Sequence, residues 1–563
     1  MRARASRRTG RGAAQVLAAL LAGFVANAAA PGGWRVHAPS RGSTATSSLW
    51  AALVAASRPI GPAKERSVAV LVDLRSGKRP VLLYRFARAR RLGVRWEAGT
   101  RWASLSGAPA VVGAAFDVPV LDYRAPSGRE YLASPDPARL PKVLGGEVAA
   151  LGRIGGFRLA HPVVLAPPLP SLLPRLVPAG GLSPARLVQA YGAAPLRRAG
   201  YDGAGQTVVL LDWAPPRQSD LESFAAEAGL PPLRPLLAGE GPEMPFADDT
   251  GVPGAAVEEA TMDAELVHEI APAAKVVVFD ANPSGSGDPA GIATLFQDIA
   301  RSYPGAIWSL SIGWLCDRFY TWPDLEAINS ALSAAEAGGT TAFSATGDAD
   351  GLECEEEGLS QAYDTPPGPD DVGLDAASAL PAMTAVGGTT LSVRLDGAWF
   401  AEEAWDDSAL ALGTGGGVST VVPRPSWQRA VGVAAGLSSA QAGFRETPDV
   451  AADADPRTGA KIIVDGQVAQ GGGTSQAAPI WAGLCALMDQ FLERNGGHAL
   501  GAINPILYEL ARTPEPYPPF HDVTLGGNAV HLAGVGYDLV TGLGTPSTYN
   551  LAWDLLRYER SHR

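Results

Sequence analysis

The stretch QTVVLLD, residues 206–212, is an apolar run that ends in an acidic residue. Three more apolar runs follow at 274–281, 305–314 and 340–348, and helix-like segments such as 257–271 lie between them. Short strands that are apolar on both faces and alternate with helices are typical of a parallel sheet covered on both sides. The sequence therefore predicts an α/β fold with its functional groups at the carboxyl ends of the strands.

The composition is that of a large, packed globular protein. The chain has 563 residues, of which 46% are hydrophobic and 18% charged, and its formal net charge is −12. This length predicts two or more domains, and the composition excludes a mainly disordered chain. Beyond the first dozen residues we find no basic block that would serve as an electrostatic footprint for nucleic acid, so we expect no nucleic-acid partner.

Residues 1–30 have the pattern of a secretory signal. Arginines precede an apolar run from Ala13 to about Val25, and small residues follow it. We expect cleavage there and a secreted, extracellular protein, with the export route left open between the general and the twin-arginine pathways by the pair Arg7 and Arg8. No later run of about 18 apolar residues predicts a membrane span, so we expect no membrane association after cleavage.

A serine stands in the glycine-rich bend QGGGTSQAAPIWAGL, residues 470–484, directly before an apolar helical segment. A hydrolase can place its nucleophile in such a bend, and Ser475 would then need a base. We find no histidine in the later part of the chain with the sequence context of that base. His268, in ELVHEIAP, is better interpreted as a helix-surface histidine.

Two carboxyl groups offer an alternative base. Glu259 and Asp263 are four residues apart, so a helix would place them on one face. If that face is buried, the two groups cannot both ionise easily, and the pair can share a proton and accept one from a serine. A solvated acidic face is the other interpretation, and we expect it for Glu258, Glu265 and Glu269.

Three motifs in this order resemble the sedolisin family of serine-carboxyl peptidases, which share the subtilisin fold. GGTSQAAP (472–479) resembles the nucleophile motif, EATMD (259–263) the Glu-xxx-Asp motif and SATGD (344–348) a third acidic motif. Further segments resemble framework regions of the same family: 384–391, 415–428 and 445–459.

The resemblance implies a role for each catalytic residue. Ser475 would be the nucleophile, Glu259 the base and Asp263 its proton-holding partner, while Asp348 would donate to the oxyanion beside the backbone N–H of Ser475. An ionised aspartate cannot donate, so Asp348 must be protonated, which implies activity at acid pH. A carboxylate can still serve as a base at a pH where imidazole is charged.

The resemblance also implies the domain organisation. We expect a subtilisin-like parallel sheet flanked by helices in 183–563 and an α+β, ferredoxin-like pro-domain of the pro-kumamolisin type in 31–164. That pro-domain would act as an intramolecular inhibitor. The Pro- and Gly-rich linker 165–182 is the expected processing region.

Two features near the strand ends have open roles. SIGW resembles the family's substrate-binding strand, so we expect Ser311, Gly313 and Trp314 to line a site where an extended peptide pairs with the backbone. An ordinary core strand end is the alternative. Asp212 is either a structural cap or a further acid that supports Glu259.

A C-terminal segment, 520–546, resembles the family's calcium segment and is not an EF-hand loop. The resemblance implies one structural Ca²⁺, and a glycine-rich turn without an ion is the alternative. The implied ligands are the carboxylates of Asp522 and Asp538 and the carbonyls of Val523, Gly534 and Gly536.

The chain has three cysteines, too few for a disulfide scaffold. Cys316 and Cys354 follow the ends of strands that we expect to be neighbours, and secretion permits a bridge between them. Cys485 is then expected to be a buried thiol.

Together these features predict a secreted, acid-active serine-carboxyl endopeptidase that acts on peptides or proteins and functions as a monomer. A tripeptidyl-peptidase of the same family is one alternative. A catalytically inactive, calcium-stabilised binding homologue is another, although all four catalytic positions are filled, which argues against it.

Overall fold

The structure is a computed structural model in which the predicted signal and most of the predicted linker lie outside the described residues. The described residues are 53–64, 67–125, 130–156, 181–239, 254–281, 289–314, 316–354, 371–407, 412–429, 443–513 and 517–562.

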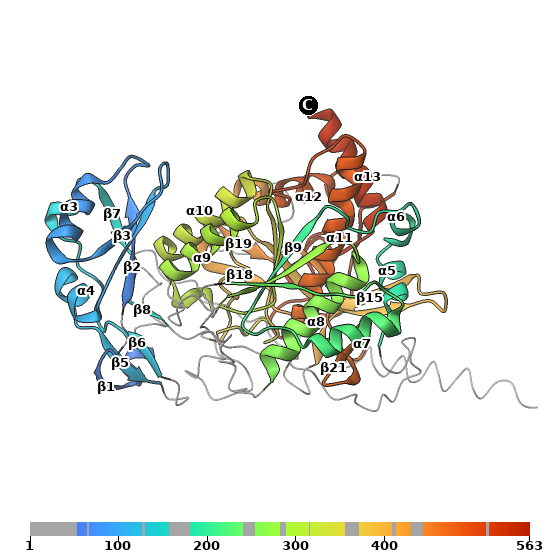
Figure 1. The fold of residues 1–563 in the computed structure, drawn as a ribbon, viewed down its shortest axis with the longest axis horizontal. Helices are drawn as coiled ribbons and strands as arrows, with labels where there is room; N and C mark the ends of the chain where they lie inside the picture. Colours follow the sequence, from blue (N-terminus) through green and yellow to red (C-terminus); the bar gives the residue numbers. More distant parts are fainter. Residues whose placement is uncertain are drawn as a thin grey trace, which may run out of the picture. The chain divides into compact units, whose positions relative to one another are not determined.

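A central eight-stranded sheet organises the chain from residue 181 onward (Figure 1). Its order is β10-β11-β9-β12-β13-β14-β15, and β20 also pairs with β14. Every pair is parallel except β14 with β15, which confirms the predicted parallel sheet. The strands are β9 (Thr207–Asp212), β10 (Leu236–Ala238), β11 (Lys275–Asp280), β12 (Ile307–Leu310), β13 (Thr341–Ala345), β14 (Thr384–Val393), β15 (Trp399–Ala404) and β20 (Val450–Asp453).

The first strand, β9, lies inside the sheet between β11 and β12. From β9 the chain builds β10 and β11 on one side of this strand. It then returns to build β12 and the remaining strands of the sheet on the other side. The carboxyl ends of adjacent strands diverge at such a switch point, and α/β proteins bind ligands there.

Helices cover both faces of this sheet, and the alternation of β9 decides which core each residue joins. Val208 and Leu210 pack with α8 (Ala255–Ile270) and α11 (Thr474–Arg494). Val209 and Leu211 pack in a second core with α9 (Pro289–Ser302) and α10 (Trp322–Ala337). Figure 1 shows α9 and α10 side by side next to the sheet. A strand buried on both faces explains why QTVVLLD is apolar without alternation.

Residues 53–156 build sheets and a hydrophobic core of their own. One antiparallel sheet has the order β3-β4-β2-β7, and α3 and α4 complete a βαββαβ succession, which is the ferredoxin-like arrangement expected from the sequence. A second sheet has the order β1-β5-β6-β8. The elements are β1 (Arg58–Pro62), β2 (Val68–Leu74), α3 (Val81–Arg90), β3 (Gly93–Arg95), β4 (Trp102–Gly107), α4 (Pro109–Phe116), β5 (Leu121–Arg124), β6 (Glu130–Ala133), β7 (Val148–Leu151) and β8 (Gly155–Gly156).

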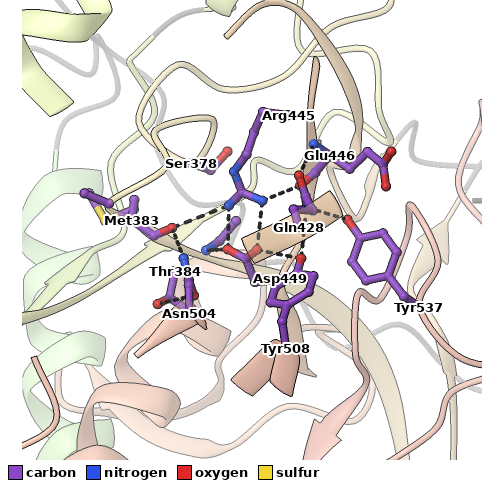
Figure 2. A network of polar contacts seen from close by, with 12 residues as sticks. Ser378, Met383, Thr384, Gln428, Arg445, Glu446, Asp449, Asn504, Tyr508 and Tyr537 are labelled. Atoms are coloured by element: carbon purple, nitrogen blue, oxygen red, sulfur yellow. Dashed lines mark hydrogen bonds and ion pairs between the residues drawn. The ribbon is translucent and has the colours of Figure 1, made fainter. Parts of the chain in front are cut away.

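A buried ion pair holds the segment that leads into β20 (Figure 2). The Arg445 guanidinium donates to both oxygens of Asp449, over 2.8 and 2.6 Å, and neither side chain is exposed. Asp449 also accepts the Tyr508 hydroxyl at 2.8 Å and the N–H of Ala385, a residue of β14, at 2.8 Å. Both carboxylate oxygens of Asp449 are thus hydrogen-bonded where the pair anchors β20 against β14.

Replacing Asp449 by Ala should destabilise the fold strongly, because it leaves a buried guanidinium without its counter-charge. We expect a loss of about 3–5 kcal/mol, measured by urea unfolding in a Ser475→Ala background that excludes self-digestion. Asp117→Ala is the control, since its ion pair with Arg139 is exposed (side chains 79% and 71%) and should contribute under about 1 kcal/mol. Equal effects of the two changes would contradict the anchoring role.

Candidate active site

Ser475 is the second residue of α11 and is only 5% exposed. Gly473 caps the helix with φ +78°, a conformation that favours glycine. A side chain there would also collide, because its Cβ would lie 2.6 Å from Oδ2 of Asp348. The bend therefore brings the predicted nucleophile to the positive end of a helix and directly beside the predicted oxyanion donor.

The predicted carboxyl pair lies on a buried face of α8. Glu259 is 7% exposed and Asp263 is fully buried. Burial and the nearby charge of Asp263 raise the pKa of Glu259 well above its ordinary value, and burial likewise raises the pKa of Asp263. Of the two interpretations of the pair, the structure favours the buried, proton-sharing one.

The Ser475 hydroxyl lies between two acceptors. It donates to the carbonyl of Ser311 over 3.0 Å. It also lies near enough to Glu259 to lower the pKa of that carboxyl, although neither Glu259 oxygen accepts a hydrogen bond from a described residue. Ser311 in turn donates from its own hydroxyl to Asp263 over 2.6 Å. A turn of the Ser475 hydroxyl from Ser311 to Glu259 would therefore direct its proton to the base.

Asp348 follows β13 and is held by Thr474. One carboxylate oxygen, Oδ1, accepts the N–H of Thr474 at 2.7 Å and its hydroxyl at 2.9 Å. The other oxygen is the one that faces Gly473. The sequence analysis missed this role of Thr474, although a hydroxyl residue directly before the nucleophile was a signal that could have suggested it.

Asp212, at the end of β9, joins the same group of acids. It is buried, and among the described residues neither of its carboxylate oxygens has a hydrogen-bond partner. Burial raises its pKa to about 7, and its charge raises the pKa values of Glu259 and Asp263. A structural cap would accept backbone N–H groups, so the structure favours the supporting acid.

The predicted substrate strand is more deeply engaged than expected. The N–H of Trp314 donates to Asp375 at 2.6 Å, its carbonyl accepts the Tyr320 hydroxyl at 3.0 Å, and its indole packs on Phe296. Both backbone groups of Trp314 are therefore already used within the chain. Pairing with a peptide at this strand depends on Gly313, which is partly exposed.

The expected solvated face of α8 is wrong for Glu265 and Glu269, and the expected surface position is wrong for His268, because all three side chains are buried. Oε2 of Glu265 accepts the N–H of Ile463 at 2.8 Å, and burial raises the pKa of Glu265 to about 9. Ile463 belongs to a hairpin of β21 (Lys461–Val464) and β22 (Gln467–Gln470). The hairpin covers α8, although it lies almost two hundred residues further along the sequence. No local sequence pattern can reveal such a contact.

The five candidate calcium ligands lie in one group of turns. Asp538 is buried and accepts the N–H of Gly534 at 3.0 Å, while Asp522 accepts the N–H of Gly536 at 3.0 Å. The N–H of Thr541 donates to the Asp538 carboxylate over 2.7 Å, and the Thr541 hydroxyl lies 3.5 Å from the carbonyl oxygen of Val523. Carboxylate and carbonyl oxygens are the donors that calcium prefers, so the set fits this ion.

The cysteines are arranged as the strand ends suggest. Cys316 and Cys354 form a disulfide, with 4.8 Å between their Cα atoms, and Cys485 is a buried free thiol on α11. The bridge ties the segment after β12 to the loop that carries Asp348.

Comparison with known proteins identifies similar sequences and a similar fold. Residues 250–500 match the Subtilase family model. Kumamolisin from Bacillus sp. (strain MN-32) is 32% identical over 366 residues, which are 63% of this chain and 61% of kumamolisin, so the chain spans less than two thirds of that relative. Sedolisin from Pseudomonas sp. (strain 101) is 28% identical over 457 residues, 78% of this chain and 73% of that one.

A solved structure is similar as well. It is the Pseudomonas sedolisin, described as a serine-carboxyl proteinase complexed with two molecules of pseudo-iodotyrostatin. It has a TM-score of 0.54 and 26% identity and covers 68% of this chain and 98% of that one. The predicted subtilisin-like fold is thereby confirmed. In the part of the chain that the structure describes, no helix has the length and apolarity of a membrane span.

Asp212→Asn should flatten the pH dependence of stability. Unfolded, Asp212 loses its proton near its ordinary pKa of 3.8, whereas the folded group keeps it to about 7. The folded state thus binds the extra proton between pH 4 and 7, and stability falls as the pH rises through that window. Wild type should lose on the order of 4 kcal/mol more than the variant, read from urea unfolding. Exposed Asp396→Asn is the control, and parallel pH curves for all three proteins would refute the assignment.

Proposed function

The chain belongs to the sedolisin family of serine-carboxyl peptidases, and from this premise we propose that it is a secreted, acid-active endopeptidase that cleaves peptides or proteins through an acyl-enzyme on Ser475. The single observation that carries the proposal is the position of the Ser475 hydroxyl. It lies beside Glu259 within a group of buried acids, with Asp348 across the same bend. A nucleophile, a base and an oxyanion donor thus occur together.

In the proposed reaction, Ser475 attacks the carbonyl carbon of the substrate and Glu259 accepts its proton. Asp263, held by the Ser311 hydroxyl, orients Glu259 and shares the charge. The substrate carbonyl becomes an oxyanion, which accepts hydrogen bonds from the backbone N–H of Ser475 and from protonated Asp348. Glu259 then returns its proton to the leaving amine, and a water molecule releases the acyl group by the reverse steps.

Repulsion among the acids supports a working range at acid pH. Glu259 has its pKa raised by burial and then by the charges of Asp263, Asp212 and Asp348. Such a group resists carrying several negative charges, so at acid pH it holds protons on some members and a negative charge on another. A rising pH would remove the proton that Asp348 needs as a donor, while a falling pH would neutralise the base.

The N-terminal domain is proposed as an intramolecular inhibitor, and its contacts with the peptidase helices support this role. Arg95 of β3 pairs with Asp298 of α9 at 2.9 Å. The N–H of Arg153 donates to Asp324 of α10 at 3.3 Å, and its guanidinium lies over the Tyr320 ring. Removal of this domain by cleavage in the linker would complete activation.

A pH–rate profile on N-blocked peptides tests the proposed activity. We expect an optimum at acid pH and no turnover by Ser475→Ala. Asp348→Ala should lose about 10²–10³ in rate, whereas Asp348→Asn keeps a donor at every pH and should retain activity further toward neutral pH. Highest activity at neutral pH, or full turnover by Asp348→Ala, would refute the mechanism. Cleavage of unblocked peptides alone, three residues at a time, would favour the tripeptidyl-peptidase instead.

One structural Ca²⁺ is proposed at Asp522, Val523, Gly534, Gly536 and Asp538. When bound, the ion would join turns that are distant in sequence and so raise the stability of the fold. A chelator should therefore lower the melting temperature, and added calcium should restore it. Asp522→Asn should weaken the response to both, because it removes a carboxylate ligand. An unchanged melting temperature after chelation would count against the site.

A further inference from the structure

Residues 347–351, which carry Asp348, form a loop that we call the oxyanion loop. The turn between the candidate calcium ligands Asp522 and Asp538 contacts this loop through Asn528. Its side chain is buried, and its Nδ2 donates to the carbonyl of Thr414 over 3.1 Å. Its Oδ1 accepts the N–H groups of Val530 at 3.0 Å and His531 at 2.7 Å. One amide thus closes its own turn and holds a second segment of the chain.

That second segment runs alongside Asp348. The N–H of Gly413 donates to the Asp348 carbonyl at 3.0 Å, and the Gly413 carbonyl accepts the N–H of Asp350 at 3.0 Å. On the other side, the N–H of Gly415 donates to the carbonyl of Gly347 at 2.9 Å. Thr414, the residue that Asn528 holds, therefore stands between the two residues that fix the backbone around Asp348.

The same turn also contacts the oxyanion loop directly. The N–H of Ala529, next to Asn528, donates to the Asp350 carbonyl at 3.1 Å. A Cβ on Gly351 would lie 2.9 Å from Nδ2 of Asn528, and one on Gly415 would lie 2.1 Å from the Thr346 carbonyl oxygen. The segments are in close contact, so a shift at Asn528 displaces the loop instead of being absorbed by free space.

We propose that Asn528 is a positioning residue for Asp348. It holds the segment 413–415 and the loop 347–351 in the geometry that aims Oδ2 of Asp348 at the nucleophile bend. The inference rests on the proposed function of Asp348 as the oxyanion donor. Because the donor acts on the developing oxyanion, the loss of Asn528 slows the chemical step and leaves substrate binding intact.

Three variants test this role, each compared on folded protein at acid pH. Asn528→Ala should lower kcat by about 3- to 10-fold, the effect of one lost hydrogen bond, with KM within about twofold of wild type. The matched control is Asn550→Ala, since Nδ2 of this partly exposed residue also donates to a carbonyl, that of Pro518, at 3.0 Å. The control should keep both constants within about twofold of wild type.

Asn528→Asp separates positioning from a general loss of structure. Its carboxyl can still accept from Val530 and His531, but it can donate to Thr414 only when protonated. The kcat of this variant should therefore approach wild type at the lowest pH and fall earlier than wild type as the pH rises. A merely structural role would lower the melting temperature without this change in the pH profile.

A peptide aldehyde supplies a readout besides turnover, because its adduct with the serine places an oxygen in the oxyanion position. Its inhibition constant should rise by the same factor as kcat falls in Asn528→Ala. If Asn528→Ala keeps wild-type kcat while Asp348→Ala loses activity, the inference is overturned and the proposed function stands. If Asp348→Ala keeps full activity, the oxyanion role itself fails.

Discussion

The burial of two carboxyl groups on α8 is the constraint on which the active site depends. Glu259 and Asp263 carry raised pKa values because α8 is packed against α11 and the sheet, out of reach of water. The two helices approach so closely that a side chain at Gly483 would lie 3.0 Å from Ile270. The same packing that makes the core therefore raises the pKa values of both carboxyl groups, and a looser contact would solvate the pair and lower them.

This protein places acids without cationic partners in its interior at several points beyond the site. Glu402 accepts hydrogen bonds from the neutral side chains of Tyr191, Thr389, Trp399 and Thr545, and burial still raises its pKa. Burial also raises the pKa of Asp489 to about 8. Because such groups keep protons in the folded state that the unfolded chain releases, the fold loses stability as the pH rises above the ordinary range of carboxyl groups. The stability of the fold thus favours acid pH.

The ends of three neighbouring strands supply half of the site. Asp212 ends β9, Ser311 follows β12 and Asp348 follows β13, so a parallel register brings residues more than one hundred positions apart to one edge. α8 and α11 then add the carboxyl pair and Ser475 from the face above. This division explains why the order of the motifs in the sequence bears no simple relation to their order in the site.

Much of this arrangement could be predicted from the sequence, because it depends on local patterns. Apolar runs predicted the strands, helical spacing placed Glu259 and Asp263 on one face, and the glycines before Ser475 predicted its bend. The occupied backbone of Trp314 and the burial of Glu265 could not be predicted, since each depends on partners far along the chain. The sequence by itself determined which groups can do the chemistry. Only the tertiary structure decided which of these groups are shielded from water, which are already hydrogen-bonded within the chain and which are available to react. Burial and hydrogen bonding are set by segments that no local sequence pattern contains.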